Sequence, residues 1–132
     1  MGLAIDAVCN LFTEYEVSNG QTGLDEHFLE QIRFPAEWRK GVSIDDYIGM
    51  KDRAGIERSL LIAVRAGDQR MRGSFEIPYD QVAAVCRKYP ERFSVLAGID
   101  PYRGMDGVRE LEYAVKELGF VGAHLYPHWI EL

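Results

Sequence analysis

The chain has 132 residues, with 21 acidic and 15 basic side chains, a formal net charge of −6 and 47% hydrophobic residues. This length is about that of one globular domain, and the composition excludes collagen-like, disordered and disulfide-rich chains. The acidic balance argues against nucleic-acid binding, no apolar run is long enough to cross a bilayer, and the N-terminus lacks the basic start of a signal peptide, so we expect a cytoplasmic protein without membrane or nucleic-acid partners.

Four short apolar runs predict β-strands, at residues 3–9, 58–64, 93–99 and 120–126. The runs are nearly continuous instead of alternating between apolar and polar residues. This pattern is typical of strands that are covered on both faces, as in a parallel sheet.

Helical patterns fill the intervals between these strands, at residues 43–55, 79–89 and 105–118. Ser43 is a favourable N-cap for the first helix, and Gly55 and Gly119 are favourable residues just past the ends of the first and third. The predicted order is βαβαβαβ, which indicates an α/β fold with a parallel sheet and helices outside it.

Residues 14–42 do not fit this alternation of strands and helices, because they are polar and contain turn signals and scattered aromatic side chains. A long insertion between a strand and its helix is usually functional in an α/β fold. We expect a lid or a binding loop here.

The chemistry of a parallel α/β sheet is found at the carboxyl ends of its strands. The polar residues that follow the four predicted strands are therefore the candidate site residues: Asn10, then Arg65, Arg70 and Arg72, then Arg103, and finally His124, Tyr126 and His128.

The arginines after the second strand suggest an anion-binding site, because guanidinium groups bind carboxylate or phosphate through paired hydrogen bonds. The alternative is a solvated loop in which these arginines pair with Asp68 and Glu76. The sequence favours neither interpretation. The predicted substrate-binding residues are Asn10, Arg65, Arg70, Arg72 and Arg103.

His124 and Tyr126 share one face of the fourth strand, because side chains alternate along a strand. With His128 they are the predicted catalytic residues. His128 is explained as a ligand, as an acid or base, or as an ordinary surface histidine beyond Pro127, and since a lone histidine is more often structural, these two histidines alone do not predict a metal site. Cys9, at the end of the first strand, would be a nucleophile only beside a histidine. A buried free thiol is the more frequent case.

Two motifs precede the third and fourth strands: Tyr89-Pro90-Glu91-Arg92-Phe93 and Leu118-Gly119-Phe120-Val121-Gly122. With the segment that follows, through Pro127, they resemble the amidohydrolase-related proteins typified by aminocarboxymuconate semialdehyde decarboxylase. The resemblance covers residues 1–132 nearly end to end, including the insertion, and is most specific over residues 79–128.

The resemblance implies a metal-dependent (β/α)8 TIM barrel that acts as a hydrolase or a nonoxidative decarboxylase on small acids, with a divalent metal, commonly zinc. The family's first strand usually ends in Asp-x-His-x-His, whereas Val8 and Asn10 occupy the histidine places here. His124 and Tyr126 likewise stand where the family often has Lys and His. The remaining usual ligands belong to strands beyond Leu132, so no metal site is complete in this chain.

Four strands are about half of such a barrel, which typically takes about 250 residues. We therefore expect residues 1–132 to be the N-terminal half of one barrel domain, with the insertion at about 14–42. A half-barrel leaves open sheet edges, so we expect a homo-oligomer or association through these edges.

The sequence favours an amidohydrolase-like hydrolase for a small anionic substrate, aromatic or an acyl-CoA. Nonoxidative decarboxylation and a non-catalytic ligand-binding barrel are the alternatives. An independent flavodoxin-like interaction domain is a third possibility, which predicts a self-contained fold.

Overall fold

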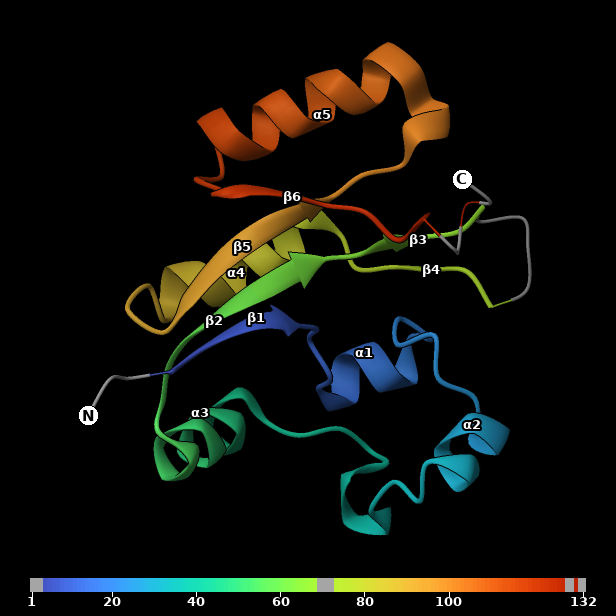
Figure 1. The fold of residues 1–132 in the computed structure, drawn as a ribbon, viewed down its shortest axis with the longest axis vertical. Helices are drawn as coiled ribbons and strands as arrows, with labels where there is room; N and C mark the ends of the chain where they lie inside the picture. The colour runs from blue at the N-terminus through green and yellow to red at the C-terminus, as the bar shows by residue number, and fades with distance from the viewer. Residues whose placement is uncertain (1–3, 69–72, 128–129, 131–132) are drawn as a thin grey trace.

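The computed structural model describes residues 4–68, 73–127 and 130. Its main sheet has four parallel strands in the order of the chain: β1 (Ala4–Cys9), β2 (Ile56–Ala63), β5 (Phe93–Gly98) and β6 (Gly122–His124). All four strands run toward the same side of the molecule (Figure 1). The predicted parallel α/β sheet is therefore confirmed, with the strand order of a barrel wall.

Three long helices connect the strands: α3 (Ile44–Ala54), α4 (Tyr79–Lys88) and α5 (Gly104–Lys116), the last preceded by the short η2 (Pro101–Arg103). The Ser43 side chain accepts a hydrogen bond from the backbone N–H of Asp46, and Gly55 ends α3 in the left-handed conformation with φ of +70°. Both capping predictions for this helix are confirmed.

Most of the core lies between the helices and one face of the sheet, which we call the outer face, and Ile62 of β2 on the opposite face is fully buried as well. The outer-face side chains are Phe93, Val95 and Ala97 on β5 and, in register with them, Ser59, Leu61 and Ala63 on β2, all of them buried. Tyr47 from α3 stacks on Phe93, with ring centroids 6.2 Å apart. We call the opposite face, which carries Leu60 on β2 and Leu96 and Gly122 on β5 and β6, the inner face.

Burial on both faces, which the apolar runs predicted, is wrong for the first strand. Ile5 and Val8 of β1 have exposed fractions of 62% and 61%, and Val121 beside β6 is 63% exposed. Ile5 and Val8 belong to one edge strand of the sheet, Val121 directly precedes the other, and nothing in the described part of the chain covers these side chains. The exposed apolar edges agree with association at the sheet edges, which stays a prediction.

The insertion contains three short helices, α1 (Glu14–Ser18), α2 (Glu26–Gln31) and η1 (Ala36–Trp38), where the sequence suggested only a polar loop. Its two ends meet, because the backbone N–H of Val42 donates to the carbonyl of Phe12 at 2.7 Å. Figure 1 shows α1 near the carboxyl ends of the strands. The insertion is thus a compact unit placed beside the edge that carries the candidate site.

A small antiparallel pair follows β2, formed by β3 (Arg65–Ala66) and β4 (Phe75–Glu76). The sequence predicted a plain loop here, because a two-residue strand leaves no periodic pattern. Arg70 and Arg72 fall between these strands, in residues 69–72, and lie outside the described residues.

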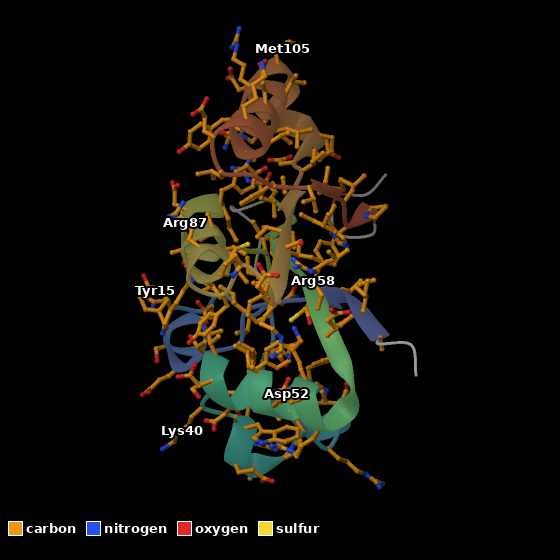
Figure 2. All side chains as sticks on the ribbon, turned by 90° about the vertical axis from the view of Figure 1, so that its left-hand side faces the viewer. Tyr15, Lys40, Asp52, Arg58, Arg87 and Met105 are labelled. Carbon is orange, nitrogen blue, oxygen red and sulfur yellow. The ribbon has the colours of Figure 1, made fainter. Side chains whose placement is uncertain are left out.

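The amino ends of the strands are closed by Arg58, which Figure 2 labels beside the strands in a view onto this side. Its Nη1 donates to the carbonyl of Phe93 at 3.2 Å and to Ser94 Oγ at 3.0 Å. These contacts of Arg58 therefore hold the amino ends of β2 and β5 together.

Within the described part of the chain, none of the helices is long and apolar enough to cross a membrane.

Arg33 provides a first prediction on stability. It follows α2 with φ of +53°, and the next residue, Phe34, donates its N–H to the Leu29 carbonyl at 2.9 Å, as in a glycine-ended helix. We expect Arg33→Gly to raise the free energy of unfolding by about 0.5–1 kcal/mol, because glycine adopts this conformation without the penalty of a side chain. Denaturant unfolding measures it. Gly55→Ala, at another left-handed helix end, should lower the stability by a similar amount, and a loss in both variants would contradict the argument.

Candidate functional site

His124 is the last residue of β6 and lies in register with Gly98 at the carboxyl end of β5. Since Ala97 belongs to the outer face, Gly98 and its partner His124 belong to the inner face. The predicted position of His124 at the carboxyl edge is therefore confirmed, and it faces the side of the sheet that a barrel encloses.

The imidazole of His124 is half-buried beside one aromatic ring. The ring of Tyr126 meets it edge-to-face, with centroids 4.4 Å apart and an interplanar angle of 63°. Nδ1 is buried, and no described residue gives it a hydrogen-bond partner. Burial lowers the pKa of His124 below its usual value, so the imidazole is neutral at pH 7 and can donate from one nitrogen and accept at the other. His128, the third predicted catalytic residue, lies outside the described residues.

Gly98 and Tyr79 shape the strand end opposite His124, and the sequence analysis did not single them out. The Tyr79 hydroxyl donates to the Gly98 carbonyl at 2.6 Å, which fixes the end of β5 opposite His124. A Cβ on Gly98 would lie 2.2 Å from the carbonyl oxygen of Ala63, so β2 and β5 approach closely only because this residue is glycine. The sequence signal that could have indicated this close approach is a glycine at the end of the apolar run of β5.

Cys9, at the end of β1, faces the outer side of the sheet. Its Sγ donates to the Tyr47 hydroxyl at 3.1 Å, and the same hydroxyl donates to Asp6 Oδ2 at 3.1 Å and contacts Ser59 Oγ at 3.2 Å. Burial raises the pKa of Cys9 to about 11, so the thiol is protonated at neutral pH. The sheet separates Cys9 from the inner-face His124, and the hypothesis of a Cys–His nucleophile is not supported.

Val8, the neighbour of Cys9, is 61% exposed within a register shift of β1, and Asn10, which follows the strand, is exposed. The described residues do not provide a divalent metal with a set of ligands, since no group of three or more His, Cys, Asp or Glu side chains gathers within residues 4–68, 73–127 and 130. The carboxylate of Asp6 is hydrogen-bonded to Tyr47 on the outer side. The chain's own residues therefore do not fit the metal that the resemblance implies.

Arg65 and Arg103 share one carboxylate partner, Glu110 of α5. The Arg65 Nε also lies 3.5 Å from Glu76 Oε1, and its guanidinium carbon lies 4.5 Å from the centroid of the Tyr79 ring. The Arg65 side chain is directed toward α4 and α5, away from the inner face, and only 13% of it is exposed. The pairing with Glu76 was one of the two interpretations of the sequence, whereas Glu110 lies too far along the chain to be inferred.

The substrate-binding roles of Arg65 and Arg103 stay predictions. For Arg65 this role now requires that an anionic substrate compete with both Glu76 and Glu110 for the guanidinium group. Such competition is costly, because a partly buried ion pair that loses one partner leaves the other charge uncompensated.

A hollow of about 360 Å³ lies beneath the insertion, between α1, α2 and the segment that leads into β4. Phe12, Leu29 and Arg39 line it, with Gly73 and Ser74 on the other side. Arg39 pairs with Glu26 at 2.5 Å, and its buried Nε has no hydrogen-bond partner among the described residues. The insertion therefore lines a partly enclosed space of mixed polarity, and its role as a lid or a binding loop stays a prediction.

Three comparisons place the chain among known proteins. A family model described as amidohydrolase matches residues 33–132, and no curated protein matches the chain. The structure is similar to that of 2,6-dihydroxybenzoate decarboxylase from Rhizobium, with a TM-score of 0.61 and 25% identity over 93% of this chain and 38% of that one.

The structure is also similar to that of a dihydroxybenzoic acid decarboxylase from Polaromonas sp. JS666 with bound manganese and 2-nitroresorcinol, with a TM-score of 0.61 and 28% identity over 93% of this chain and 38% of that one. An uncharacterized TIM-barrel protein from Bordetella bronchiseptica shares the fold, with a TM-score of 0.64 and 20% identity over 98% of this chain and 45% of that one.

The chain thus spans between 38% and 45% of the length of these structures, as the half-barrel prediction requires. Its four parallel strands form one half of a (β/α)8 barrel wall. The sequence motifs before β5 and β6, the strand order and the match of the family model from residue 33 to residue 132 agree, and the chain belongs to the amidohydrolase family.

Proposed function

We propose that the barrel to which this chain contributes binds a small aromatic carboxylic acid at the carboxyl edge of the sheet and removes its carboxylate without oxidation. One observation carries the proposal. His124 stands on the inner face at this edge as a neutral imidazole with an unpartnered buried nitrogen among the described residues. The similarity to two decarboxylases of dihydroxybenzoic acids supports the substrate class.

The chemistry that such a reaction needs is a proton transfer. The bond between the ring carbon and the carboxyl carbon breaks, CO₂ leaves, and the electron pair stays on the ring carbon, which then takes a proton. A neutral imidazole acts as a base at its unprotonated nitrogen, and the imidazolium that then forms is an acid near the operating pH. In the proposal neutral His124 takes the proton of a hydroxyl group on the substrate ring and, as the imidazolium, transfers it to the ring carbon as CO₂ leaves. The phenolate product then takes a proton from water.

The other predicted residues have supporting roles in this proposal. The Tyr126 ring orients the imidazole by its edge-to-face contact, and Asn10 offers an amide beside the same edge. The anion-binding residues would be the arginines Arg65, Arg70, Arg72 and Arg103, and His128 would be a second acid or base.

Hydrolysis is the second candidate, because the matching family model is described as amidohydrolase. It is the reaction that the sequence favoured, and it needs an activated water molecule in addition to a proton donor. Decarboxylation requires fewer catalytic groups from the described residues than hydrolysis does, since one proton-transferring group at the site suffices. Where the full-length protein binds aromatic acids without converting them, the non-catalytic barrel is the better account.

The experiment is a turnover assay on the full-length protein with 2,6-dihydroxybenzoate and, separately, with an anilide of benzoic acid. We expect CO₂ release and formation of resorcinol from the first compound, followed by chromatography. Cleavage of the anilide with no CO₂ from the acid would replace the proposal with hydrolysis. Binding of the acid without either product would replace it with a binding protein.

A further inference from the structure

Val8 occupies the place at the end of β1 where the family usually has its first metal-binding histidine. A register shift in β1 lies between Asp6 and Cys9, and Val8 within it is 61% exposed, away from the outer-face core that Asp6 and Cys9 contact. A histidine at this position would therefore be exposed at the carboxyl edge that also carries His124. The backbone is in the right place for a ligand, but an isopropyl group has no donor atom.

The only carboxylate of β1 is engaged elsewhere. Asp6 Oδ2 accepts a hydrogen bond from Tyr47 at 3.1 Å, and its Oδ1 accepts one from the backbone N–H of Val8 at 3.2 Å. The Tyr47 hydroxyl also contacts Cys9 and Ser59, so it holds Asp6 within a network on the outer side. Turning Asp6 toward the inner face would break this network and leave partly buried polar groups unpaired.

Few other ligand atoms lie near the strand ends within the described residues. Asn10 offers one neutral amide oxygen, His124 offers one imidazole nitrogen, and Asp100 after β5 accepts the backbone N–H of Tyr102 at 3.0 Å through Oδ1. Divalent metals in protein sites usually take at least three protein ligands, chiefly imidazole, thiolate and carboxylate groups. The described half of the barrel falls short of this requirement.

We infer that β1 of this protein supplies no metal ligand, so that the organic ligand meets the end of β1 through hydrogen bonds and any divalent metal ion in the full-length protein is held without this strand. The exposed amide of Asn10 and the unpartnered nitrogen of His124 are the groups that would make these hydrogen bonds. The inference concerns the ligand set of the site and holds for either reaction considered above.

The test measures manganese in the full-length protein by elemental analysis after growth with added Mn²⁺, and Mn²⁺ affinity by titration calorimetry. We expect Asn10→Ala to leave the manganese content and affinity of the wild type unchanged. The double variant V8H/N10H restores both histidines and should bind Mn²⁺ at least about 100-fold more tightly. Ile5→His, which adds a histidine to the same face nearer the start of β1, is the matched control and should change nothing.

One equivalent of manganese in the wild type, released by Asn10→Ala, would overturn the inference. Circular dichroism monitors the fold of each variant, and where V8H/N10H does not fold, the wild-type content and Asn10→Ala still decide. The outcome is separable from the proposed reaction. A manganese content that Asn10→Ala does not change upholds both the inference and the reaction if the protein releases CO₂, and only the inference if it shows no turnover. Manganese that Asn10→Ala releases, in a protein that releases CO₂, upholds only the reaction.

Discussion

His124→Ala in the full-length protein is expected to lower kcat for decarboxylation by about 10²- to 10⁴-fold, the usual contribution of a positioned general acid or base. The reason is geometric. His124 ends β6 on the inner face, with a buried Nδ1 that has no partner in the described part of the chain. Its removal deletes the proton donor and leaves the outer-face core untouched. Steady-state kinetics with 2,6-dihydroxybenzoate measures the effect.

The matched control is His27→Ala. His27 is exposed on α2 within the insertion, where its Nε2 contacts Gln31 Nε2 at 3.1 Å, and the variant should keep the wild-type kcat. Equal rates for wild type and His124→Ala would remove His124 from the catalytic residues. Equal losses in both variants would point to a general effect on folding.

The pH profile distinguishes a reacting imidazole from a structural one. Burial lowers the pKa of His124 below its ordinary value of 6.5. If the neutral form reacts, kcat/KM holds its plateau at pH 7 and falls only as the pH drops through a value below 6.5. The same shift makes the folded protein lose stability as the pH falls from the ordinary value toward the lowered one, because the unfolded chain binds the proton first. If His124 has only a structural role, kcat/KM will not fall as the pH drops through the lowered pKa of His124.

Local sequence signals predicted the elements that depend on local chemistry. Ser43 and Gly55 mark the ends of α3 because an N-cap hydroxyl and a left-handed glycine act within one helical turn. The four strands and their parallel order followed from apolar runs that alternate with helical patterns. The short pair β3 and β4 could not be predicted, since its two-residue strands lack any period and are held together by two paired positions far apart in the loop.

The sequence predicted at which edge of the sheet the candidate residues lie, but it did not predict toward which face of the sheet each side chain points. The rule that chemistry lies at the carboxyl ends of strands selected His124 and Arg65 together. The structure sends them in different directions, because Arg65 pairs with Glu110 on a helix 45 residues further along the chain. Such a contact depends on how α5 packs, which no local pattern encodes. The same limit applies to Cys9, whose partner Tyr47 comes from α3.

Gly98→Ala is expected to lower the free energy of unfolding by about 3 kcal/mol, at the upper end of what overpacking usually costs. The new Cβ would lie 2.2 Å from the Ala63 carbonyl oxygen and 2.6 Å from the Arg65 amide nitrogen. Both are backbone atoms of the strand end next to it, so no side chain can rotate away and the end of β5 must move. Urea unfolding of the full-length protein measures the loss.

Gly49→Ala is the opposite case and the control. Gly49 lies inside α3, and its Cβ would meet only the far end of the flexible Arg53 side chain, at 3.5 Å. Alanine is the better helix former, so this variant should gain about 0.5–1 kcal/mol. The displacement in Gly98→Ala also reaches His124, its register partner on β6, and should lower kcat as well as stability. Equal stabilities for the two variants would mean that the close approach of β2 and β5 does not depend on a glycine at position 98.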